Sequence, residues 1–458
     1  MAENQIAGKT ANKQQQKEGK DVTLKIEIPI VTMDISDLRS PLLPMDTPTS
    51  PEAPGLIMKD ECNFIQNVSQ FYNQQALSDV VLKIDGDTYY SHKFVLAKSS
   101  DVFRTMLYDG PWTQTTSKEV QLSESQECRA VFDRFLRFLY TAEISINTEA
   151  AVGILCLADK YNVSSLKKLC TQYMVEHTKS PKVRNALTWY SWAKGLHLQD
   201  LIDQCSKTIA WNTETILNST EWLAMDIDFV YDILNKEELV VMNEYVLYNG
   251  LVKWLLSETH IEDFSENSSK LLPMIRFPQM MVHQLYEIES SDMSQKEECK
   301  DILKDLIGQA YRFRSLCPSQ SSLNVSFHKK FYLPRNYMDL AVDTVRMQNT
   351  LRFGIQVDVR TYAGPVPTDA REGDWKITYR KNNDCWTLQL ICHESAMING
   401  EARIQASVLV YNQEEKVVQL EQVPTFVCSR GNNLSITMNV DSPDEVKVMV
   451  VLIKPVPY

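Results

Sequence analysis

The stretch LSDVVLKIDGDTYYSHKFVLAKSSDVFRTML, residues 77–107, decides the fold of the first domain of the chain. Its first half alternates apolar and polar residues on either side of Asp85-Gly86, which predicts two strands joined by a tight turn. Residues 92–100 and 101–108 then carry apolar residues at helical spacing, with Ser99 or Ser100 as the cap of the second helix. Two strands followed directly by two helices favour a small sheet covered by helices.

The sequence on both sides of this stretch extends the same pattern. Upstream, ECNFIQNVSQFYNQQAL (61–77) places Phe64, Val68 and Phe71 at helical spacing. Downstream, KEVQL and AEISI (142–146) favour strands, and apolar stripes predict helices in CRAVFDRFLRFLY (128–140), AAVGILCLADKY (150–161) and SSLKKLCTQYMVEH (164–177). We therefore expect an α+β domain over residues 61–178.

Three further regions differ from this domain in composition and in the spacing of their apolar residues. Residues 1–58 are polar or rich in Pro, Ser and Thr, which predicts a disordered tail. Residues 181–316 repeat apolar residues at three/four spacing, which predicts an all-α helical bundle. Residues 325–458 hold about seven short alternating segments separated by turn residues, which predicts an all-β antiparallel sandwich. We expect five tryptophans of the bundle to fill its core: Trp189, Trp192, Trp211, Trp222 and Trp254.

Composition narrows the class of partner. The formal net charge of −12 argues against nucleic acid, because phosphate neutralisation needs an excess of cations. No apolar run is long enough to span a bilayer, and the N-terminus shows no secretory leader. The 10 cysteines form no CxxC pair, as in chains kept in a reducing compartment. We expect a cytoplasmic protein, with the nucleus as the alternative, and no membrane partner.

The sequence carries no catalytic signature. It lacks GxGxxG after a strand, a Walker lysine, HExxH and GxSxG. The His92-Lys93 pair at a helix start could serve catalysis or a structural charge contact, and no nucleophile or oxyanion loop accompanies it. We expect a non-catalytic protein without metal or cofactor.

Ordered motifs carry a resemblance to known families. The segments LSDVVLKIDGDTYYSHKFVLAKSSDVFRTML, FLRFLYTAEISI and LADKYNVSSLKKLC resemble a BTB/POZ domain over 61–178. FVYDILNKEELVVMNEYVLYNGLVKWL and LLPMIRFPQM resemble the BACK domain, so the two resemblances cover 61–316. GDWKITYRKNNDCWTLQLICHESAMINGEARIQASVLVY looks like a diverged MATH/TRAF-type sandwich within 325–458.

The BTB resemblance implies a homodimer. In that family the first helix packs across a two-fold axis, which assigns Phe64, Val68 and Phe71 to the dimer interface. An acidic residue before the first strand and a basic residue at the helix start form a partly buried charged corner there, which assigns Asp79 and Lys93. The alternative is that the apolar stripe folds onto its own domain.

The resemblance also implies cullin-3 as a partner, since BTB–BACK proteins commonly act as substrate adaptors of cullin-3 ubiquitin ligases. The residues expected to contact the cullin are Met106, Leu107, Tyr108, Asp109, Tyr161 and Asn162. The chain departs from the family at one point. Many adaptors carry a hydrophobic-x-Glu motif where this sequence has Pro111-Trp112-Thr113, so the glutamate is missing.

These resemblances together predict a homodimeric substrate-recognition adaptor of a cullin-3 RING E3 ubiquitin ligase. The C-terminal sandwich would bind an unknown protein substrate, with Trp375, Tyr379, Trp386 and Tyr411 as aromatic candidates of which only a subset can face a partner. The competing hypothesis is a BTB-mediated interaction scaffold without a ligase role, which the missing glutamate favours.

Overall fold

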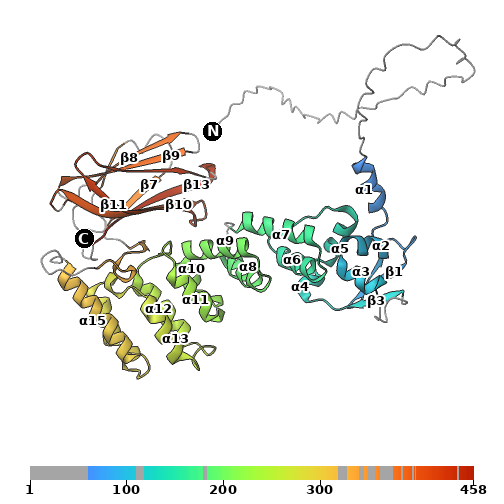
Figure 1. The fold of residues 1–458 in the computed structure, drawn as a ribbon, viewed down its shortest axis with the longest axis horizontal. Coiled ribbons are helices and arrows are strands. Elements are labelled where there is room, and N and C mark those ends of the chain that lie inside the picture. The colour runs from blue at the N-terminus through green and yellow to red at the C-terminus, as the bar shows by residue number, and fades with distance from the viewer. Residues whose placement is uncertain are drawn as a thin grey trace, which may run out of the picture. The chain divides into compact units, whose positions relative to one another are not determined.

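A computed structural model provides the structure of the chain (Figure 1). It describes residues 60–109, 118–178, 183–317, 327–339, 345–348, 356–361, 375–382, 385–394, 397, 399–440 and 443–457. The expected tail at 1–58 and the Pro111-Trp112-Thr113 segment lie outside these residues. No helix among the described residues is both long and apolar enough to cross a bilayer.

The first part of the described chain holds a three-stranded sheet in the order β2-β1-β3. Strands β1 (Val80–Ile84) and β2 (Asp87–Ser91) pair antiparallel, as the sequence predicts. The turn between them needs positive φ at Asp85 and Gly86, 45° and 107°, which glycine adopts without strain. Strand β3 (Glu119–Leu122) pairs with β1 in the parallel direction.

Seven helices accompany this sheet, and each has a buried or partly buried apolar side. They are α1 (Glu61–Ser69), α2 (Lys93–Ser99), α3 (Asp101–Tyr108), α4 (Gln126–Arg129), α5 (Phe132–Thr141), α6 (Ala151–Lys160) and α7 (Ser164–His177). The predicted strand at 142–146 is wrong, because this segment forms no ladder with another described strand. It begins at Ala142, whose φ of 56° ends α5 in a left-handed cap.

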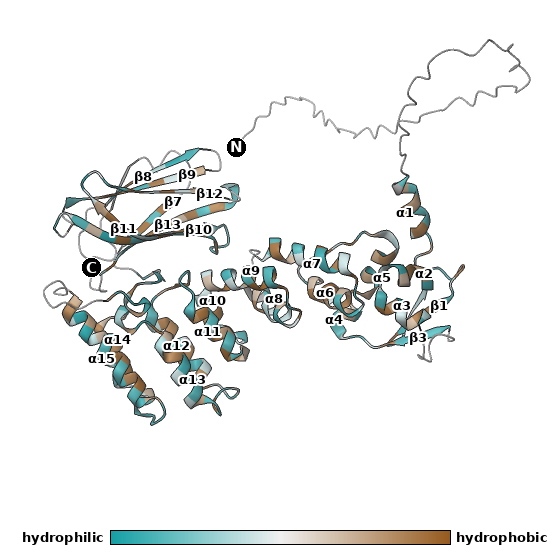
Figure 2. Cartoon of the chain, viewed as in Figure 1, coloured by the Kyte–Doolittle hydropathy of each residue, from teal (hydrophilic) through white to brown (hydrophobic). Residues whose placement is uncertain are grey.

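The next part is helical, as predicted. Its α-helices are α8 (Val183–Gly195), α9 (Gln199–Trp211), α10 (Thr213–Leu217), α11 (Ile227–Asn235), α12 (Glu244–Leu255), α13 (Phe264–Leu271), α14 (Val282–Glu289) and α15 (Lys300–Leu316). Short 3₁₀ turns link them: η2 (Glu221–Ala224), η3 (Leu272–Met274), η4 (Phe277–Gln279) and η5 (Asp292–Gln295). Figure 2 shows hydrophobic and hydrophilic residues interleaved along helices such as α15, which buries Leu303, Leu306, Ile307, Ala310 and Phe313.

Four of the five tryptophans of this part are buried: Trp189, Trp211, Trp222 and Trp254. The indole N–H groups of Trp222 and Trp254 donate to the carbonyls of Gly250 and Met225, so burial leaves neither group unpaired. The expectation that Trp192 lies in the core is wrong, because its side chain is exposed on α8.

The segment that follows α15 packs on the helices. It holds the 3₁₀ turn η7 (Lys330–Tyr332) and strand β5 (Asn336–Tyr337), which pairs parallel with the two-residue strand β4 (Val240–Val241). Arg335, beside β5, is buried against Glu244 on α12, with 2.7 Å between Nε and Oε1. Residues 327–339 therefore complete the core of the helical part.

The C-terminal strands form two four-stranded sheets, in the orders β11-β10-β13-β7 and β12-β9-β8-β6. Their bounds are β6 (Val345–Gln348), β7 (Gln356–Thr361), β8 (Trp375–Asn382), β9 (Cys385–Cys392), β10 (Glu401–Asn412), β11 (Val417–Ser429), β12 (Leu434–Asn439) and β13 (Val446–Pro455). The 3₁₀ turn η10 (Pro443–Glu445) precedes β13. One hydrophobic core holds side chains from both sheets, including Trp386 and Val451, so the sheets form a sandwich.

The expectation of a wholly antiparallel sandwich is wrong. β7 pairs parallel with β13, and β6 pairs parallel with β8, so each sheet carries one parallel pair at an edge. Alternation in a sequence predicts that a residue faces in or out, and both strand directions satisfy it equally. The alternation of apolar and polar residues therefore could not predict the direction of the edge strands.

Candidate protein-interaction surfaces

The start of α2 is a corner where charge and hydrogen bonds converge. The Asp79 carboxylate accepts a hydrogen bond from the backbone N–H of Lys93 at 2.8 Å, which stabilises an otherwise unpaired helix N-terminus. The structure thus brings together the two residues that the sequence analysis assigned to a charged corner. Asp79 is exposed and Lys93 partly exposed, so the corner is accessible at the surface of the single chain.

His92 has a structural environment at the same corner. Its backbone N–H donates to the Tyr140 hydroxyl at 3.0 Å, and its Nδ1 lies 3.0 Å from the same oxygen. Its Nε2 lies 3.3 Å from the Ala76 carbonyl. All three contacts are satisfied when Nε2–H donates to Ala76 and the Tyr140 hydroxyl donates to Nδ1. This arrangement uses the imidazole to join α5 to the loop before β1.

An exposed apolar surface runs from α1 to α2, and we call it the α1 surface: Phe64, Ile65, Phe71, Leu77 and Phe94. Phe64 is 66% exposed. The Phe71 ring packs edge-on against His92, with centroids 5.7 Å apart, so this surface adjoins the charged corner. Val68 is partly buried and packs on the core. Sequence reasoning missed Ile65, Leu77 and Phe94: the helical period places Ile65 and Phe94 no differently from core residues, and Leu77 lies in the loop before β1, where no period applies.

A groove of about 350 Å³ lies beside the α1 surface. Phe64, Ile65 and Val68 from α1 line one part of it, and residues 138–142 at the end of α5 line another. Lys98 is its charged member, and Ser99 and Ser165 are among the hydroxyl-bearing residues that line it. Apolar side chains above a groove of this size are typical of a surface that another protein covers.

The end of α3 carries the residues expected to contact a cullin. Tyr108 is 52% exposed, Asp109 is exposed, and Met106 is partly buried. Leu107 is buried in the domain core, so its assignment as a contact residue is corrected. Leu107 and Tyr108 are adjacent and point about 100° apart around the helix axis, and a short apolar stretch does not reveal which of them faces the core.

The turn after α6 carries the other two expected residues. Asn162 is exposed and adopts a φ of 51°, which allows the chain to leave α6 and enter α7. The assignment of Tyr161 as a contact residue is corrected, because its side chain is only 1% exposed. Its ring stacks on Phe103 at 4.4 Å, and its hydroxyl donates to Glu124 at 2.5 Å. Burial is the main cause that raises the pKa of Tyr161, and the hydrogen bond to Glu124 raises it as well.

Ser100 ties these two segments together. Its hydroxyl oxygen accepts from the Phe103 backbone N–H at 3.1 Å and caps α3. The same hydroxyl donates to the Tyr161 carbonyl at 2.5 Å. The start of α3 and the end of α6 therefore touch, whereas Tyr108 and Asp109 lie at the far end of α3.

The aromatic candidates of the C-terminal sandwich are not free surface residues. Trp375, Tyr379 and Trp386 are buried between the two sheets. Tyr411 is partly buried against the helical core, and its hydroxyl lies 3.5 Å from the Met338 sulfur. No ring among these four is an exposed platform for a partner.

One sheet of the sandwich packs on the helical part. Outward residues of β10 and β13, namely Leu409, Val450 and Leu452, belong to the same core as the helices. The side-chain amide of Asn212 bonds both backbone groups of Val417 on β11, at 3.3 and 3.2 Å. The outer face of the sheet β11-β10-β13-β7 is therefore largely occupied within the chain.

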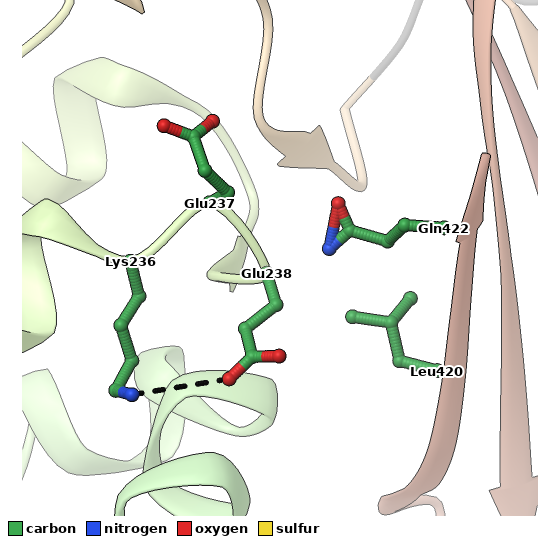
Figure 3. A pocket seen from close by; sticks show the side chains of 5 residues that line it. All are labelled: Lys236, Glu237, Glu238, Leu420 and Gln422. Carbon is green, nitrogen blue, oxygen red and sulfur yellow. Dashed lines mark ion pairs between the residues drawn. The ribbon is translucent and has the colours of Figure 1, made fainter. Parts of the chain in front are cut away.

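A pocket of about 470 Å³ lies beside this contact (Figure 3). Lys236, Glu237 and Glu238 from the loop after α11 face Leu420 and Gln422 on β11. Burial raises the pKa of Glu237, but Arg276 and Lys330 outweigh this effect and hold the pKa below its usual value. Within the described ranges no three His, Cys, Asp or Glu side chains gather as a metal-binding group.

Comparisons with known proteins agree with this architecture. Residues 68–178 match the BTB/POZ domain family, and residues 186–289 match the family described as BTB And C-terminal Kelch, BACK. BTB/POZ domain-containing protein 17 of Homo sapiens is 28% identical to this chain over 336 residues, which cover 72% of this chain and 68% of that protein.

A more distant relative and a solved structure match smaller shares of the chain. Kelch repeat and BTB domain-containing protein 8 of Danio rerio is 26% identical over 212 residues, which cover 46% of this chain and 34% of that protein. The solved structure of the BTB domain of human gigaxonin is 21% identical, with a TM-score of 0.23, and the match covers 26% of this chain and 97% of that structure.

Proposed function

Because this chain is a BTB–BACK protein homologous to BTB/POZ domain-containing protein 17, we propose that it acts as a homodimeric substrate-recognition adaptor of a cullin-3 RING ubiquitin ligase. Members of the BTB–BACK family are often cullin-3 adaptors and are typically non-catalytic. The adaptor brings a client lysine to the charged conjugating enzyme and makes or breaks no bond itself. It works in the cytoplasm, with the nucleus as the alternative.

The observation that carries the proposal is the exposed α1 surface. An isolated chain would leave Phe64, Ile65 and Phe71 in water beside the Asp79–Lys93 corner. A second copy related by a two-fold axis brings the same apolar patch to itself and removes both copies from water. Val68, already partly buried, would support the patch from below.

The cullin-binding surface is reduced to four residues by the burial of Leu107 and Tyr161. Met106, Tyr108 and Asp109 come from α3, and Asn162 comes from the turn after α6. Tyr108 is the candidate anchor, because large exposed aromatics contribute a disproportionate share of interface energy.

The C-terminal sandwich, a TRAF/MATH-like receptor in this proposal, recruits the client. Since the helical part occupies the outer face of β11-β10-β13-β7, the opposite outer face, on β12-β9-β8, is the better candidate. Its outward residues include Lys376, Arg380, Gln389 and Thr437. Lys376 and Arg380 place two cationic side chains on this face, which suits an acidic client peptide.

Analytical ultracentrifugation of Phe64→Glu tests the dimer. Phe64 is exposed in the single chain, so the substitution leaves its fold intact and places like charges opposite each other across the two-fold axis. We expect a dimer at micromolar concentration for the wild type and a shift of the dissociation constant of about tenfold or more for the variant. The matched control is Tyr286→Glu on α14, an equally exposed aromatic, which should remain dimeric. A monomeric wild type would refute the dimer.

A pull-down of purified cullin-3 tests the ligase role. Tyr108→Ala should weaken capture by about tenfold or more, which corresponds to the loss of an anchor residue. Tyr286→Ala, far along the chain in α14, should capture cullin-3 like the wild type. Failure of the wild type itself to capture cullin-3 would leave the scaffold hypothesis, a BTB-mediated assembly without a ligase role, as the better account. The Pro111-Trp112-Thr113 departure is the sequence observation that favours that second hypothesis.

A further inference from the structure

Three thiols of the BTB domain surround one helix. Cys128 on α4 lies with its sulfur 3.8 Å from the Gly153 carbonyl of α6, and Cys170 on α7 lies with its sulfur 3.1 Å from the Ala151 carbonyl of the same helix. Cys156 belongs to α6 itself and follows Gly153 by one turn, on the same side of the helix. The proposed adaptor function uses none of these thiols.

The backbones of α4 and α6 are in direct contact at this point. A Cβ added to Gly153 would lie 2.5 Å from the carbonyl oxygen of Glu127, the residue before Cys128. Gly153 therefore permits an approach that any other residue would block. The side chains of Cys128 and Cys156 form a hydrogen bond with each other beside this contact of the helices.

The electrostatics of the two thiols differ. A hydrogen bond with Cys156, supported by Ser125 and Lys160, lowers the pKa of Cys128 to about 7 against the effect of burial. The same contact and burial raise the pKa of Cys156. Elsewhere in the core, burial raises the pKa of Cys205 to about 12. Cys128 is thus the thiol of the pair that loses its proton more readily, and its thiolate accepts the hydrogen bond of the neutral Cys156 thiol.

The pair is also within reach of a small molecule. Cys156 is partly exposed, whereas Cys128 is 7% exposed and Cys170 and Cys205 are fully buried. A hydroperoxide can therefore approach the pair from the Cys156 side without unfolding of the domain. A bulky reagent has no such access to Cys128.

We propose that Cys128 and Cys156 form an oxidation site that a hydroperoxide converts to a disulfide. The Cys128 thiolate attacks the terminal oxygen of ROOH, the O–O bond breaks, and RO⁻ leaves as ROH after taking a proton, which gives a Cys128 sulfenic acid. The sulfur of Cys156 then displaces the hydroxyl group, which leaves as water with the Cys156 proton. Two thiols and ROOH thus yield one disulfide, ROH and H₂O, and the peroxide oxygen is the group reduced.

Mass spectrometry on the full-length chain tests the site, with hydrogen peroxide as the probe. After exposure the chain is unfolded in denaturant and all free thiols are blocked with iodoacetamide, so that buried thiols are blocked too; disulfides are then reduced and the released thiols are labelled with an isotopically heavy reagent. We expect heavy label on Cys128 and Cys156 in equal amounts, and about tenfold or more above the label on Cys205 and Cys170. A peptide pair that is crosslinked before reduction identifies the bond directly.

Two substitutions separate this site from general thiol oxidation. In Cys156→Ser the label on Cys128 should fall about tenfold, because the sulfenic acid has no partner and advances to the sulfinic acid. In Cys170→Ser the Cys128–Cys156 label should be unchanged. The wild-type measurement stands alone if either variant fails to fold. Heavy label confined to the exposed Cys62, or a bond from Cys128 to Cys170, would overturn the proposal.

Discussion

Lys454 is a single residue whose surroundings conflict with its charge. It lies on β13 in line with Val450 and Leu452, on the face that packs against the helical part, and is 3% exposed. Its Nζ donates to the Asn336 side-chain oxygen at 2.9 Å and to the Ser407 hydroxyl at 3.0 Å, both uncharged. Burial, together with nearby Arg276, lowers the pKa of Lys454 to about 7.

The contribution of Lys454 to the stability of the chain should therefore rise with pH in the weakly alkaline range. Between pH 7 and the ordinary lysine pKa, the unfolded chain holds a proton on Lys454 that the folded chain lacks, so raising the pH favours folding. The slope from one proton is about 1.4 kcal/mol per pH unit at most. Urea unfolding of wild type and Lys454→Met at pH 7, 8 and 9 isolates this slope, because all other titrating groups are shared. Parallel pH profiles for the two proteins would contradict the expectation.

The family resemblance assigned Asp79 and Lys93 to one corner, and the structure joins the Asp79 carboxylate to the backbone N–H of Lys93. The sequence could not separate Tyr108 from Leu107, or Asn162 from Tyr161, because neighbours in a helix end differ in burial only through tertiary packing. The bond from Tyr161 to Glu124 joins positions 37 residues apart and has no local signal.

At the scale of helices and strands, the contact between α4 and α6 depends on tertiary packing in the same way as the burial of single residues. It depends on Gly153, because a methyl group there would overlap the Glu127 carbonyl and the Val131 side chain, at 2.5 and 2.9 Å. The chain offers a matched comparison in Gly308, within α15, where an added Cβ meets nothing within 4 Å. Both glycines are helical, Gly153 in the first turn of α6 and Gly308 in the middle of α15, and their surroundings differ.

Substitution by alanine should have opposite effects at these two positions. Gly153→Ala should lower the free energy of unfolding by about 1–3 kcal/mol, since α4 and α6 must separate. Gly308→Ala should raise it by up to about 1 kcal/mol, since alanine has the higher helix propensity. Urea unfolding followed by far-UV circular dichroism measures both. Equal effects of the two substitutions would show that helix packing at Gly153 is not limiting.

Helix positions were predictable from period, and strand partners were not. The stripes in 128–140 and 150–161 gave α5 and α6 nearly in full. The alternating segment at 142–146 met no strand partner among the described residues, and the edge strands β6 and β7 joined their sheets parallel. A strand is stabilised by its ladder with another segment, so its local pattern is necessary but insufficient.

Across the whole molecule, the helical part and the sandwich share one core through residues 327–339. Glu244 on α12 is fully buried and accepts from Arg335 Nε and the Tyr337 hydroxyl, each at 2.7 Å. Arg335 also donates to the carbonyls of Lys236 and Met274 at 2.8 Å. These contacts argue that the helical domain extends beyond the expected boundary at 316.

Truncation tests this boundary. A chain of residues 60–325 leaves the Glu244 carboxylate buried without Arg335 and Tyr337, which should cost about 3–5 kcal/mol relative to a chain of residues 60–340. Urea unfolding monitored by tryptophan fluorescence compares the two. Glu244→Met should recover stability in the shorter chain and reduce it in the longer one, since only the longer chain then holds an unpaired arginine. Identical unfolding midpoints for both lengths would disprove this extension of the domain.

The spacing of apolar residues alone predicted an α+β domain followed by a helical region and a strand-rich region, because helices and strands repeat apolar residues at different intervals. The packing of these regions on one another did not, since the Asn212–Val417 contact spans 205 positions. Sequence patterns predict the local structure of a segment, and they do not predict its contacts with segments that are distant in the sequence.

The shared segment also constrains how such a gene could have been assembled. A recombination event that replaced the C-terminal sandwich by another receptor, with its crossover directly after α15, would remove Arg335 and Tyr337 from the bundle. Only crossovers beyond residue 339 preserve the charge balance of Glu244. The heritable unit for exchange is therefore the helical bundle with its trailing strand.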